Sequence, residues 1–480
     1  MGAITVIVAT PLLSAVILAL VPDYRLAAKL NILFSAITLL AAFVQFGLEP
    51  SSGSLFVVDA FNIYLIALTA FVGLTTSVFS AGYIGHEVAI RRLDAGKLRF
   101  YHAMYQAFMF TMLLALSANN LGVMWVAVEG ATLTTVLMVS LYRTAASIEA
   151  AWKYFILCGV GIALALFGTI LMYLAAQPVM GPGMAAMTWT ELMVHVAKVN
   201  PAILNLAFVF LLVGYGTKVG LAPLHAWLPD AHAEGPTPIS AVLSGLLLNV
   251  ALYAVLRFKM LLAANGAAIA PGPLMVAMGL ASLLLAGLML YRRRDIKRFF
   301  AYSSIEHMGI ITFAFGMGGP LANFAGLLHM AMHSLTKSAI FYAVGHAVQV
   351  KGTQRMEKIA GLTVSHPVLG WGLLVGVVAI AGLPPFGIFM SEFLLVTSTF
   401  AREPLLAVPL AIGILVAFGA LVLRVQQVCF GAPLGGAGGN APIQGSLVPL
   451  FAHLALVLVA GLWLPGPLVA WFQTVAALLG

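Results

Sequence analysis

Charge is scarce in this sequence of 480 residues, of which 8% are Asp, Glu, Lys or Arg. Soluble domains carry about 25% charged residues, so an ordinary soluble protein is excluded. Apolar residues make up 62% of the chain, and runs long enough to cross a bilayer recur from end to end. No hydrophilic stretch is long enough to form a soluble domain. We therefore predict an all-α integral membrane protein with a single polytopic membrane domain, residues 1–480.

Cysteine is almost missing as well, since Cys158 and Cys429 are the only two. They lack the spacing of a disulfide framework, a zinc site or an iron–sulfur cluster. The glycine-rich stretch 435–439 lacks the strand and the Lys or acid that phosphate binding needs, so we expect a flexible loop there. The sequence therefore predicts no cofactor and no metal. We also expect no nucleic-acid partner, because the net charge of +8 comes from basic residues in short loops.

Apolar segments of roughly 20 residues, the length that spans a bilayer, predict about fourteen transmembrane helices. Their approximate limits are 2–20, 28–47, 59–83, 101–118, 120–142, 152–175, 201–225, 239–260, 272–291, 299–317, 321–349, 366–400, 404–430 and 446–474.

The basic residues are distributed unevenly over the loops between these segments. If the N-terminus is outside, the inner loops hold most of them, including Arg91, Arg92 and the run 292–294. The outer loops then hold only Lys198, Arg257, Lys259 and Arg402. Because Lys and Arg gather on the cytoplasmic side, this asymmetry predicts that both termini lie outside.

Two segments carry a similar interruption, Gly220-Leu-Ala-Pro223 in the seventh and Gly382-Leu-Pro-Pro385 in the twelfth. Proline removes a backbone donor and disrupts the helix. In lipid, the freed carbonyl groups must face protein or water. Interrupted helices in corresponding halves favour two inverted five-helix repeats, here spans 4–8 (residues 101–260) and spans 9–13 (residues 272–430). Two unrelated kinks are the alternative.

Ionisable side chains also occur inside apolar segments, where each costs at least ~2.5–3.5 kcal/mol. Such residues are typical of proteins that move protons or ions. Glu129 lies in the fifth segment, and Lys218 lies five residues before Pro223. A Glu129–Lys218 pair across two helices would let each group tune the proton affinity of the other. A static ion pair that locks the two helices is the alternative.

The eleventh segment carries His329, His333 and Lys337 at four-residue intervals, which places them on one helix face. The tenth segment adds Glu306 and His307. Histidine titrates near physiological pH and exchanges protons at two ring nitrogens, so this stripe favours a proton relay. Zinc binding is a rival, opposed by the charge of Lys337 and by the lack of a carboxylate in the stripe. A hydrogen-bonded core histidine is the alternative for any single member.

Two further groups lie near the interruptions. Glu392 follows the second one and is a candidate for the outer end of a proton path, with a helix cap as the alternative. His225, Asp230, His232 and Glu234 crowd into the segment after the first interruption, whose prolines and tryptophan predict an ordered re-entrant cover. This cover is a candidate inner proton inlet, with simple loop packing as the alternative.

Three motifs resemble those of the antiporter-like, proton-translocating membrane subunits of respiratory complex I, Mrp-type cation/proton antiporters and membrane-bound hydrogenases. They are Lys218-Val-Gly-Leu-Ala-Pro-Leu-His-Ala-Trp-Leu-Pro-Asp-Ala-His-Ala-Glu-Gly-Pro-Thr-Pro238, Ala301-Tyr-Ser-Ser-Ile-Glu-His307-Met-Gly309 and Gly382-Leu-Pro-Pro-Phe-Gly-Ile-Phe-Met-Ser-Glu-Phe393. The resemblance implies a fourteen-helix core with inverted repeats and broken helices 7 and 12.

The resemblance also implies roles for single residues. Glu129 and Lys218 match the family's helix-5 glutamate and helix-7 lysine. His307 and His333 match the histidines of helices 10 and 11, and Glu392 matches the helix-12 acid.

One departure from the family pattern indicates which subgroup of the family the sequence resembles. Asn249 stands where many complex I homologues have a central helix-8 lysine, and asparagine can hold a water molecule but cannot carry a proton. We expect Lys337 to supply the missing positive group. Asn249 and the segment Ser334-Leu-Thr-Lys-Ser338 are most similar to the F-type subunit of hydrogenase-4 and formate-hydrogenlyase-like complexes.

The resulting hypothesis is a proton-translocating subunit of a complex I-like or hydrogenase-like complex in a prokaryotic cytoplasmic (inner) membrane. Redox chemistry would belong to partner subunits, which include further antiporter-like subunits and a hydrogenase-like peripheral arm. Protons would enter from inside and pass through Glu129, Lys218, Asn249, His307, His333, Lys337 and Glu392. The alternatives are an Mrp-type sodium/proton antiporter subunit, a membrane subunit of an inorganic-carbon uptake complex, and a non-conducting scaffold.

Overall fold

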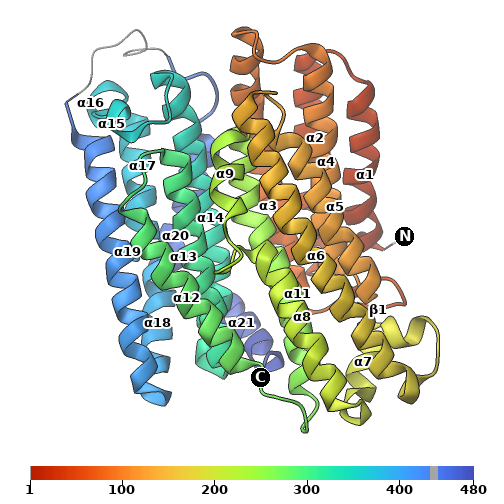
Figure 1. Cartoon of the computed structure of the whole chain (residues 1–480). Helices are drawn as coiled ribbons and strands as arrows, with labels where there is room; N and C mark the ends of the chain where they lie inside the picture. Colours follow the sequence, from red (N-terminus) through yellow and green to blue (C-terminus); the bar gives the residue numbers. More distant parts are fainter. Residues whose placement is uncertain (1, 433–441) are drawn as a thin grey trace.

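The computed structural model describes residues 2–432 and 442–480, and these residues form an almost wholly helical bundle (Figure 1). In the first half of the chain the elements are α1 (Ala3–Leu20), α2 (Tyr24–Gln45), β1 (Ser51–Ser52), β2 (Val57–Val58), α3 (Ala60–Ala89), α4 (Ala95–Ser117), α5 (Leu121–Val139), α6 (Ala145–Met180), η1 (Met184–Met187), α7 (Trp189–His195), η2 (Val196–Lys198), α8 (Pro201–Val219) and α9 (Trp227–Glu234). In the second half they are α10 (Thr237–Val242), η3 (Leu243–Leu247), α11 (Leu248–Ala263), α12 (Gly272–Leu290), α13 (Ile296–Met317), α14 (Pro320–Lys351), α15 (Met356–Ile359), α16 (Leu362–Ser365), α17 (Pro367–Ile380), α18 (Gly387–Arg402), α19 (Pro404–Phe430), α20 (Val448–Leu462) and α21 (Gly466–Leu478). The glycine-rich stretch 435–439 lies outside the described residues.

The long helices run side by side along one common direction (Figure 1). α14 lies in the interior and packs against α13, α17, α18, α20 and α21 as well as α3 and α10. Every residue of α10 and η3 is buried, and α11 is buried except at its last residue. Polar side chains on these central helices therefore face protein rather than hydrocarbon, which lowers the penalty of keeping them in a membrane.

Helices occupy every range that the sequence predicts to span the membrane, with ends shifted by several residues. Within the described residues, nine helices are long and apolar enough to cross a membrane, or up to 11 if each of two bent helix pairs counts as one span. α4, α13 and α14 are long but carry more polar residues. The chain is thus an all-helical integral membrane protein.

Both predicted interruptions are present. α8 ends at Val219, and Gly220 takes a left-handed conformation (φ 82°) before the chain returns as α9. α17 ends at Ile380, and Gly382 does the same (φ 69°) before α18 begins. Glycine adopts this conformation without the steric penalty that a Cβ atom adds.

The last predicted span, 446–474, is wrong as a single helix. It consists of α20 and α21, which bend by 82° at the short break between them. Pro465 lies in this break and directly precedes α21. Proline cannot donate a backbone hydrogen bond to the preceding turn, so the first helix ends there.

Capping side chains explain where several helices begin. Asp59 accepts hydrogen bonds from the backbone N–H groups of Phe61 and Asn62 and forms a capping box with Asn62. Asp94 and Asp295 cap α4 and α13 in a similar way. Each cap satisfies backbone donors that have no partner inside the helix.

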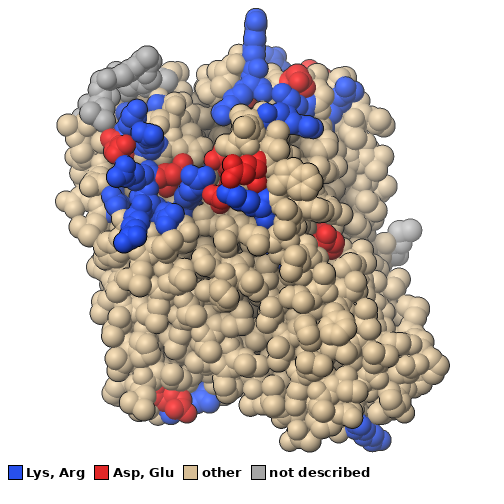
Figure 2. Space-filling model, viewed as in Figure 1, with Lys and Arg blue, Asp and Glu red and all other residues tan. Residues whose placement is uncertain are grey.

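Charged residues gather at one end of the bundle, around α9, α15 and α16, whereas the opposite end shows few (Figure 2). The C-terminus lies at the opposite end, and the N-terminus lies at the end of α1 that points away from the charged end (Figure 1). We refer to the two ends as the charged end and the opposite end.

Candidate functional site

Buried titratable side chains form two groups in the interior. Lys218 lies in the last turn of α8, directly before the first break. The second group comes from α13, α14 and α18. All of these residues are at most 7% exposed: Lys218, Glu306, His307, His329, His333, Lys337 and Glu392.

Lys218 is held by aromatic residues. Its Nζ donates a hydrogen bond to Tyr154 Oη on α6 (2.8 Å) and lies 4.5 Å from the centre of the Tyr154 ring. Tyr154 Oη lies 2.7 Å from Thr135 Oγ1 on α5. Trp227 of α9 stacks on Tyr154 (ring centres 4.5 Å apart) and donates from Nε1 to Thr217 O (2.8 Å). The break in the helix thus brings α9 back over the ammonium group, where cation–π attraction adds to the hydrogen bond.

The predicted direct pair between Glu129 and Lys218 is not formed. The two residues make no ion pair within 4.0 Å, and Glu129 Oε2 has no hydrogen-bond partner among the described residues. The physical reason is that α6 packs against both α5 and α8 and places Tyr154 beside the ammonium group.

Lys337 is bound by a backbone carbonyl group. Its Nζ donates to Phe300 O on α13 (3.0 Å). The same carbonyl oxygen accepts from Ser304 Oγ (3.0 Å), which lies 2.7 Å from Ser244 Oγ. Ser244 belongs to η3, a π-helical turn, and such turns occur frequently at functional sites. A polar connection therefore joins η3, α13 and α14.

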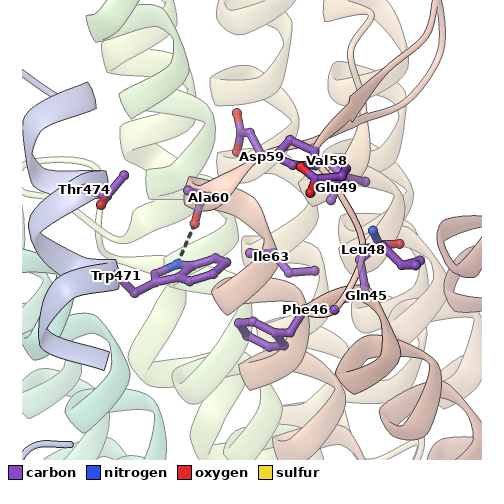
Figure 3. A pocket seen from close by; sticks show the side chains of 12 residues that line it. Gln45, Phe46, Leu48, Glu49, Val58, Asp59, Ala60, Ile63, Trp471 and Thr474 are labelled. Atoms are coloured by element: carbon purple, nitrogen blue, oxygen red, sulfur yellow. Dashed lines mark hydrogen bonds between the residues drawn. The ribbon is translucent and has the colours of Figure 1, made fainter. Parts of the chain in front are cut away.

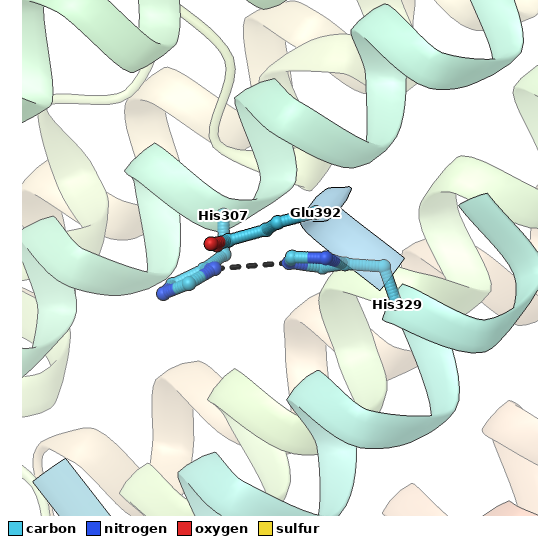
Figure 4. A group of neighbouring side chains, drawn as sticks. All are labelled: His307, His329 and Glu392. Carbon is cyan, nitrogen blue, oxygen red and sulfur yellow. Dashed lines mark hydrogen bonds between the residues drawn. The ribbon is translucent and has the colours of Figure 1, made fainter. Parts of the chain in front are cut away.

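The histidines of α13 and α14 meet directly (Figure 4). His307 Nδ1 and His329 Nε2 lie 2.9 Å apart. His329 Nδ1 lies 2.9 Å from Ser391 Oγ, and Ser391 itself donates to Ile388 O (2.8 Å). On the other side, His307 Nε2 lies 3.2 Å from Glu306 Oε2. His307 of α13, His329 of α14 and Ser391 of α18 are thus joined by hydrogen bonds, whereas Glu306 is close to His307 without a hydrogen bond.

The side chain of Glu392, on α18, points toward His307 and His329 (Figure 4). One ligating atom from each of His307, His329 and Glu392 lies within 4.8 Å of the others. Gly382 leaves the room that this carboxylate needs, because a Cβ atom there would collide with Glu392 Oε2. The ring of His333 lies 5.7 Å from that of His307 (centre to centre). The structure therefore supplies the carboxylate that the helix stripe itself lacks.

Asn249 connects α11 to α14. Its Nδ2 donates to Met330 O (3.0 Å) and Ser334 Oγ (2.8 Å), and Ser334 donates to Gly245 O (2.5 Å). Asn249 Oδ1 is buried and has no hydrogen-bond partner among the described residues. A buried oxygen of this kind is a suitable acceptor for a water molecule.

The predicted inlet residues receive partners from neighbouring helices. Asp230 forms ion pairs with Lys153 (3.4 Å) and Arg298 (3.2 Å), and Arg298 also contacts Glu234 (3.4 Å). The segment 223–238 has no basic residues of its own, and the partners of its acids come from α6 and α13. His225 is half-buried, and its ring lies against a tyrosine of α13.

Lys297, in the first turn of α13, is a buried base that the sequence did not single out. It is 2% exposed, and its Nζ donates to Ala233 O (3.1 Å) and Gly235 O (2.5 Å). These carbonyl groups lie at the C-terminal end of α9, where a cation is favoured. His232 is buried as well; its ring stacks on Phe341, and neither ring nitrogen has a hydrogen-bond partner among the described residues. Lys297 also lines a pocket of 430 Å³ at the charged end.

The placement of Arg257 and Lys259 in an outer loop is wrong, because both are buried in α11. Arg257 Nη1 forms an ion pair with Asp59 Oδ2 (2.7 Å), and its Nε donates to Tyr253 Oη (2.8 Å). Lys259 Nζ donates to Leu479 O (2.7 Å). Both residues lie inside the predicted span 239–260, and their side chains contact the start of α3 and the end of α21 instead of water.

A separate pocket of 410 Å³ lies at the opposite end, between the end of α2, the start of α3 and α21 (Figure 3). Its lining includes Glu49, Asp59 and Trp471, whose Nε1 donates to Ala60 O (2.9 Å). None of the predicted relay residues lines it. The buried titratable side chains of the candidate relay are therefore not part of this surface pocket.

The fold and the site define a polytopic membrane protein with two broken helices, whose interior carries two groups of buried acids, lysines and histidines. The family model for the NADH:quinone oxidoreductase/Mrp antiporter transmembrane region matches residues 118–418, and the chain belongs to this family. The chain is 60% identical over 470 residues to the hydrogenase-4 component F homolog of Methylacidiphilum infernorum (isolate V4), covering 98% of both sequences. These matches confirm the predicted resemblance.

Two solved structures share the fold. A chain of the membrane-bound sulfane sulfur reductase, an archaeal respiratory membrane complex, superposes with a TM-score of 0.87 at 21% identity, covering 99% of this chain and 97% of that one. A chain of the Mrp complex from Dietzia sp. DQ12-45-1b gives a TM-score of 0.82 at 20% identity, covering 99% and 96%.

Proposed function

We propose that this chain is the proton-translocating membrane subunit of a hydrogenase-4-type, complex I-like oxidoreductase complex. The family match and the 60% identity to a hydrogenase-4 component F homolog support this assignment. Redox chemistry belongs to a hydrogenase-like peripheral arm, and further antiporter-like subunits lie beside the chain in the membrane. The chain itself moves protons.

The hydrogen-bonded pair of His307 and His329 is the observation that carries the proposal. Both side chains are buried, and His307 Nδ1 lies 2.9 Å from His329 Nε2. The hydrogen bonds continue from His329 to Ser391, and Glu306 Oε2 lies 3.2 Å from His307 Nε2 without a hydrogen bond. Imidazole accepts a proton at one ring nitrogen and releases one from the other. A purely structural interior would avoid the free-energy cost of so many buried titratable groups.

The proposed path begins at the charged end. His225, Asp230 and His232 form the inlet together with Lys297, which lines the pocket there. The first half of the path contains Lys218 and Glu129. It continues through a water molecule held by Asn249 Oδ1. The second half consists of Lys337, His333, Glu306, His307, His329 and Glu392.

We further propose that the charged end faces the cytoplasm, since Lys and Arg gather on that side of membrane proteins. Both termini then lie outside. The two breaks, after Val219 and after Ile380, support a fourteen-span arrangement with inverted repeats at 101–260 and 272–430. The membrane would be the cytoplasmic membrane of a prokaryote.

A Lys218→Met variant of the assembled complex tests the relay. We expect proton pumping per redox turnover to fall by roughly 10²-fold, the usual contribution of a positioned proton-transfer group. Lys259→Met is the matched control, because Lys259 is also buried but binds Leu479 O outside the proposed path. The control should show normal proton pumping per assembled complex.

Normal coupled pumping by the Lys218→Met complex would overturn the relay. An Mrp-type sodium/proton antiporter is the second candidate, favoured by the fold shared with the Dietzia Mrp complex. Vesicles without a redox partner distinguish the two. Sodium-dependent pH changes in such vesicles would support the antiporter and contradict redox-driven pumping.

A further inference from the structure

We propose that His307, His329 and Glu392 form a binding site for a divalent transition metal ion of the Zn²⁺ type. The three residues come from α13, α14 and α18, and their ligating atoms lie within 4.8 Å of one another (Figure 4). Two histidines and one carboxylate are a common protein ligand set for a zinc ion that keeps a fourth position open. The site was not visible in the sequence, because Glu392 lies 59 positions beyond His333 and only the packing of α18 on α14 brings it to the stripe.

The two ligating nitrogens already have nearly the required spacing. His307 Nδ1 and His329 Nε2 lie 2.9 Å apart. Ligands of a tetrahedral zinc ion with Zn–N bonds of about 2.0–2.1 Å lie about 3.3 Å apart. A small rotation of either ring therefore admits the ion between them, and Glu392 supplies the third ligand.

The other ring nitrogen of each histidine already faces an acceptor. Ser391 donates its own proton to Ile388 O, so its oxygen is free to accept from His329 Nδ1–H at 2.9 Å. This hydrogen bond leaves the lone pair of His329 Nε2 directed at the site. His307 Nε2 lies 3.2 Å from Glu306 Oε2 without forming a hydrogen bond, so a small reorientation of Glu306 would be needed for its carboxylate to orient a metal-bound His307.

The surrounding charges determine which ions the site accepts. Glu306 and Glu392 supply two carboxylates, whereas Lys337 is the nearby cation and is held by Phe300 O instead of a carboxylate. The pair of carboxylates can offset both Lys337 and part of the charge of a divalent ion. Nitrogen ligands favour Zn²⁺, Co²⁺ and similar ions over Mg²⁺ and Ca²⁺, which prefer oxygen.

Occupation of this site has a consequence that rests on the proposed function. The metal ion would replace the hydrogen bond between His307 and His329. Protons could then no longer pass between the two rings, so Zn²⁺ would inhibit proton translocation reversibly.

The full-length chain, purified in detergent, tests the site by titration with Zn²⁺ against a chromophoric chelator. Co²⁺ serves as a second probe, because its visible spectrum reports tetrahedral nitrogen and oxygen ligands. We expect one ion per chain, and we expect Glu392→Gln and His329→Gln to weaken binding at least 100-fold. Ser391→Ala keeps all three ligands and should weaken binding about 10- to 100-fold, as loss of an outer hydrogen bond does.

His346→Gln is the matched control, since His346 is buried on the same helix outside the proposed site. It should bind Zn²⁺ as the natural chain does. Stoichiometric binding that survives in Glu392→Gln and His329→Gln would overturn the site, and so would the absence of binding in a monodisperse natural chain. If Ser391→Ala binds normally, the outer-shell argument is wrong and the site loses its main support.

Transport measurements separate this inference from the proposed function. Binding that depends on the three ligands together with reversible inhibition supports both. Binding without inhibition supports the metal site and contradicts a proton path through His307 and His329. Normal pumping with no metal binding contradicts the metal site alone.

Discussion

The buried lysines and the buried Arg257 differ in the kind of group that binds their charged ends. Lys297, Lys337 and Lys259 bind backbone carbonyl groups, and Lys218 binds a tyrosine hydroxyl. Arg257 instead forms an ion pair with a carboxylate. A carbonyl or hydroxyl partner adds no full negative charge, so it does not balance the charge of a protonated lysine as a carboxylate would. Arginine stays charged, which suits a structural role.

Tyr154 is expected to control the state of Lys218. Tyr154→Phe removes the hydrogen bond to Lys218 and the one to Thr135 but keeps the ring that stacks on Trp227. We expect pumping per assembled complex to fall, with a loss in the free energy of unfolding of about 1–3 kcal/mol from the buried groups left without a partner. Proton uptake into vesicles and thermal unfolding measure the two effects.

Tyr101→Phe is the control, because it removes a comparable buried hydrogen bond between Tyr101 and Ser80 (2.7 Å) outside the proposed path. If both variants lose pumping equally, Tyr154 has no special role.

Arg257 is expected to matter for stability and not for transport. Arg257→Met leaves the carboxylate of Asp59 without its partner, which typically costs about 3–5 kcal/mol for a buried pair. The double variant with Asp59→Asn should recover part of this loss. Thermal unfolding of the purified chain measures both. A double variant that is less stable than Arg257→Met would contradict the ion-pair explanation.

At the scale of single elements, the sequence predicts helices well because apolar length and capping residues act locally. The start of α3 after Asp59 agrees with the predicted limit, whereas α4 and α13 begin earlier than the predicted 101 and 299 because Asp94 and Asp295 cap them. Both Gly/Pro interruptions follow from local backbone chemistry as well. The π-helical turn at Leu243–Leu247 has no such local signal. It coincides with contacts to α14, among them the Ser334–Gly245 hydrogen bond.

The second break is expected to position Glu392. Gly382→Ala places a Cβ atom against Glu392 Oε2 in a left-handed backbone position (φ 69°). We expect the carboxylate to move and pumping to fall by about 10²-fold, the lower end of the usual contribution of a positioned proton-transfer group. Proton uptake by the assembled complex in vesicles measures this loss.

Gly352→Ala separates backbone strain from displacement of the carboxylate. Gly352 has a similar φ of 64°, and a Cβ atom there would meet nothing within 4 Å. It should lose about 1–2 kcal/mol of stability through backbone strain and pump normally. Equal loss of pumping in both variants would mean that strain, and not Glu392, is responsible.

At the scale of the whole molecule, the choice of neighbouring helices determines which buried side chains contact one another. α6 lies against both α5 and α8, so Tyr154 and not Glu129 is the partner of Lys218. α18 packs on α14, so Glu392 joins His307 and His329. α9 folds back beside α13, so Lys297 reaches its carbonyl groups. None of these contacts follows from spacing along one helix.

The orientation of the bundle is open to direct measurement. Lys358→Cys adds an accessible thiol at the charged end, and Lys198→Cys adds one in an exposed segment after α7. Both native cysteines are buried, so background labelling should be low. We expect a membrane-impermeant maleimide to label Lys358→Cys only in inverted vesicles and Lys198→Cys only in right-side-out vesicles. The opposite pattern would reverse the proposed topology.

The sequence by itself determined the membrane class, the approximate positions of the long helices, the two breaks, the family and the candidate titratable residues. These features depend on apolar length, local backbone chemistry and residue type, all of which can be read along the chain. Only the tertiary structure decided that Lys218 binds Tyr154, that Lys297 and Arg257 are buried, and that Glu392 completes a group with His307 and His329. The physical reason is that these contacts join helices far apart in sequence, and side-chain packing in three dimensions selects which helices become neighbours.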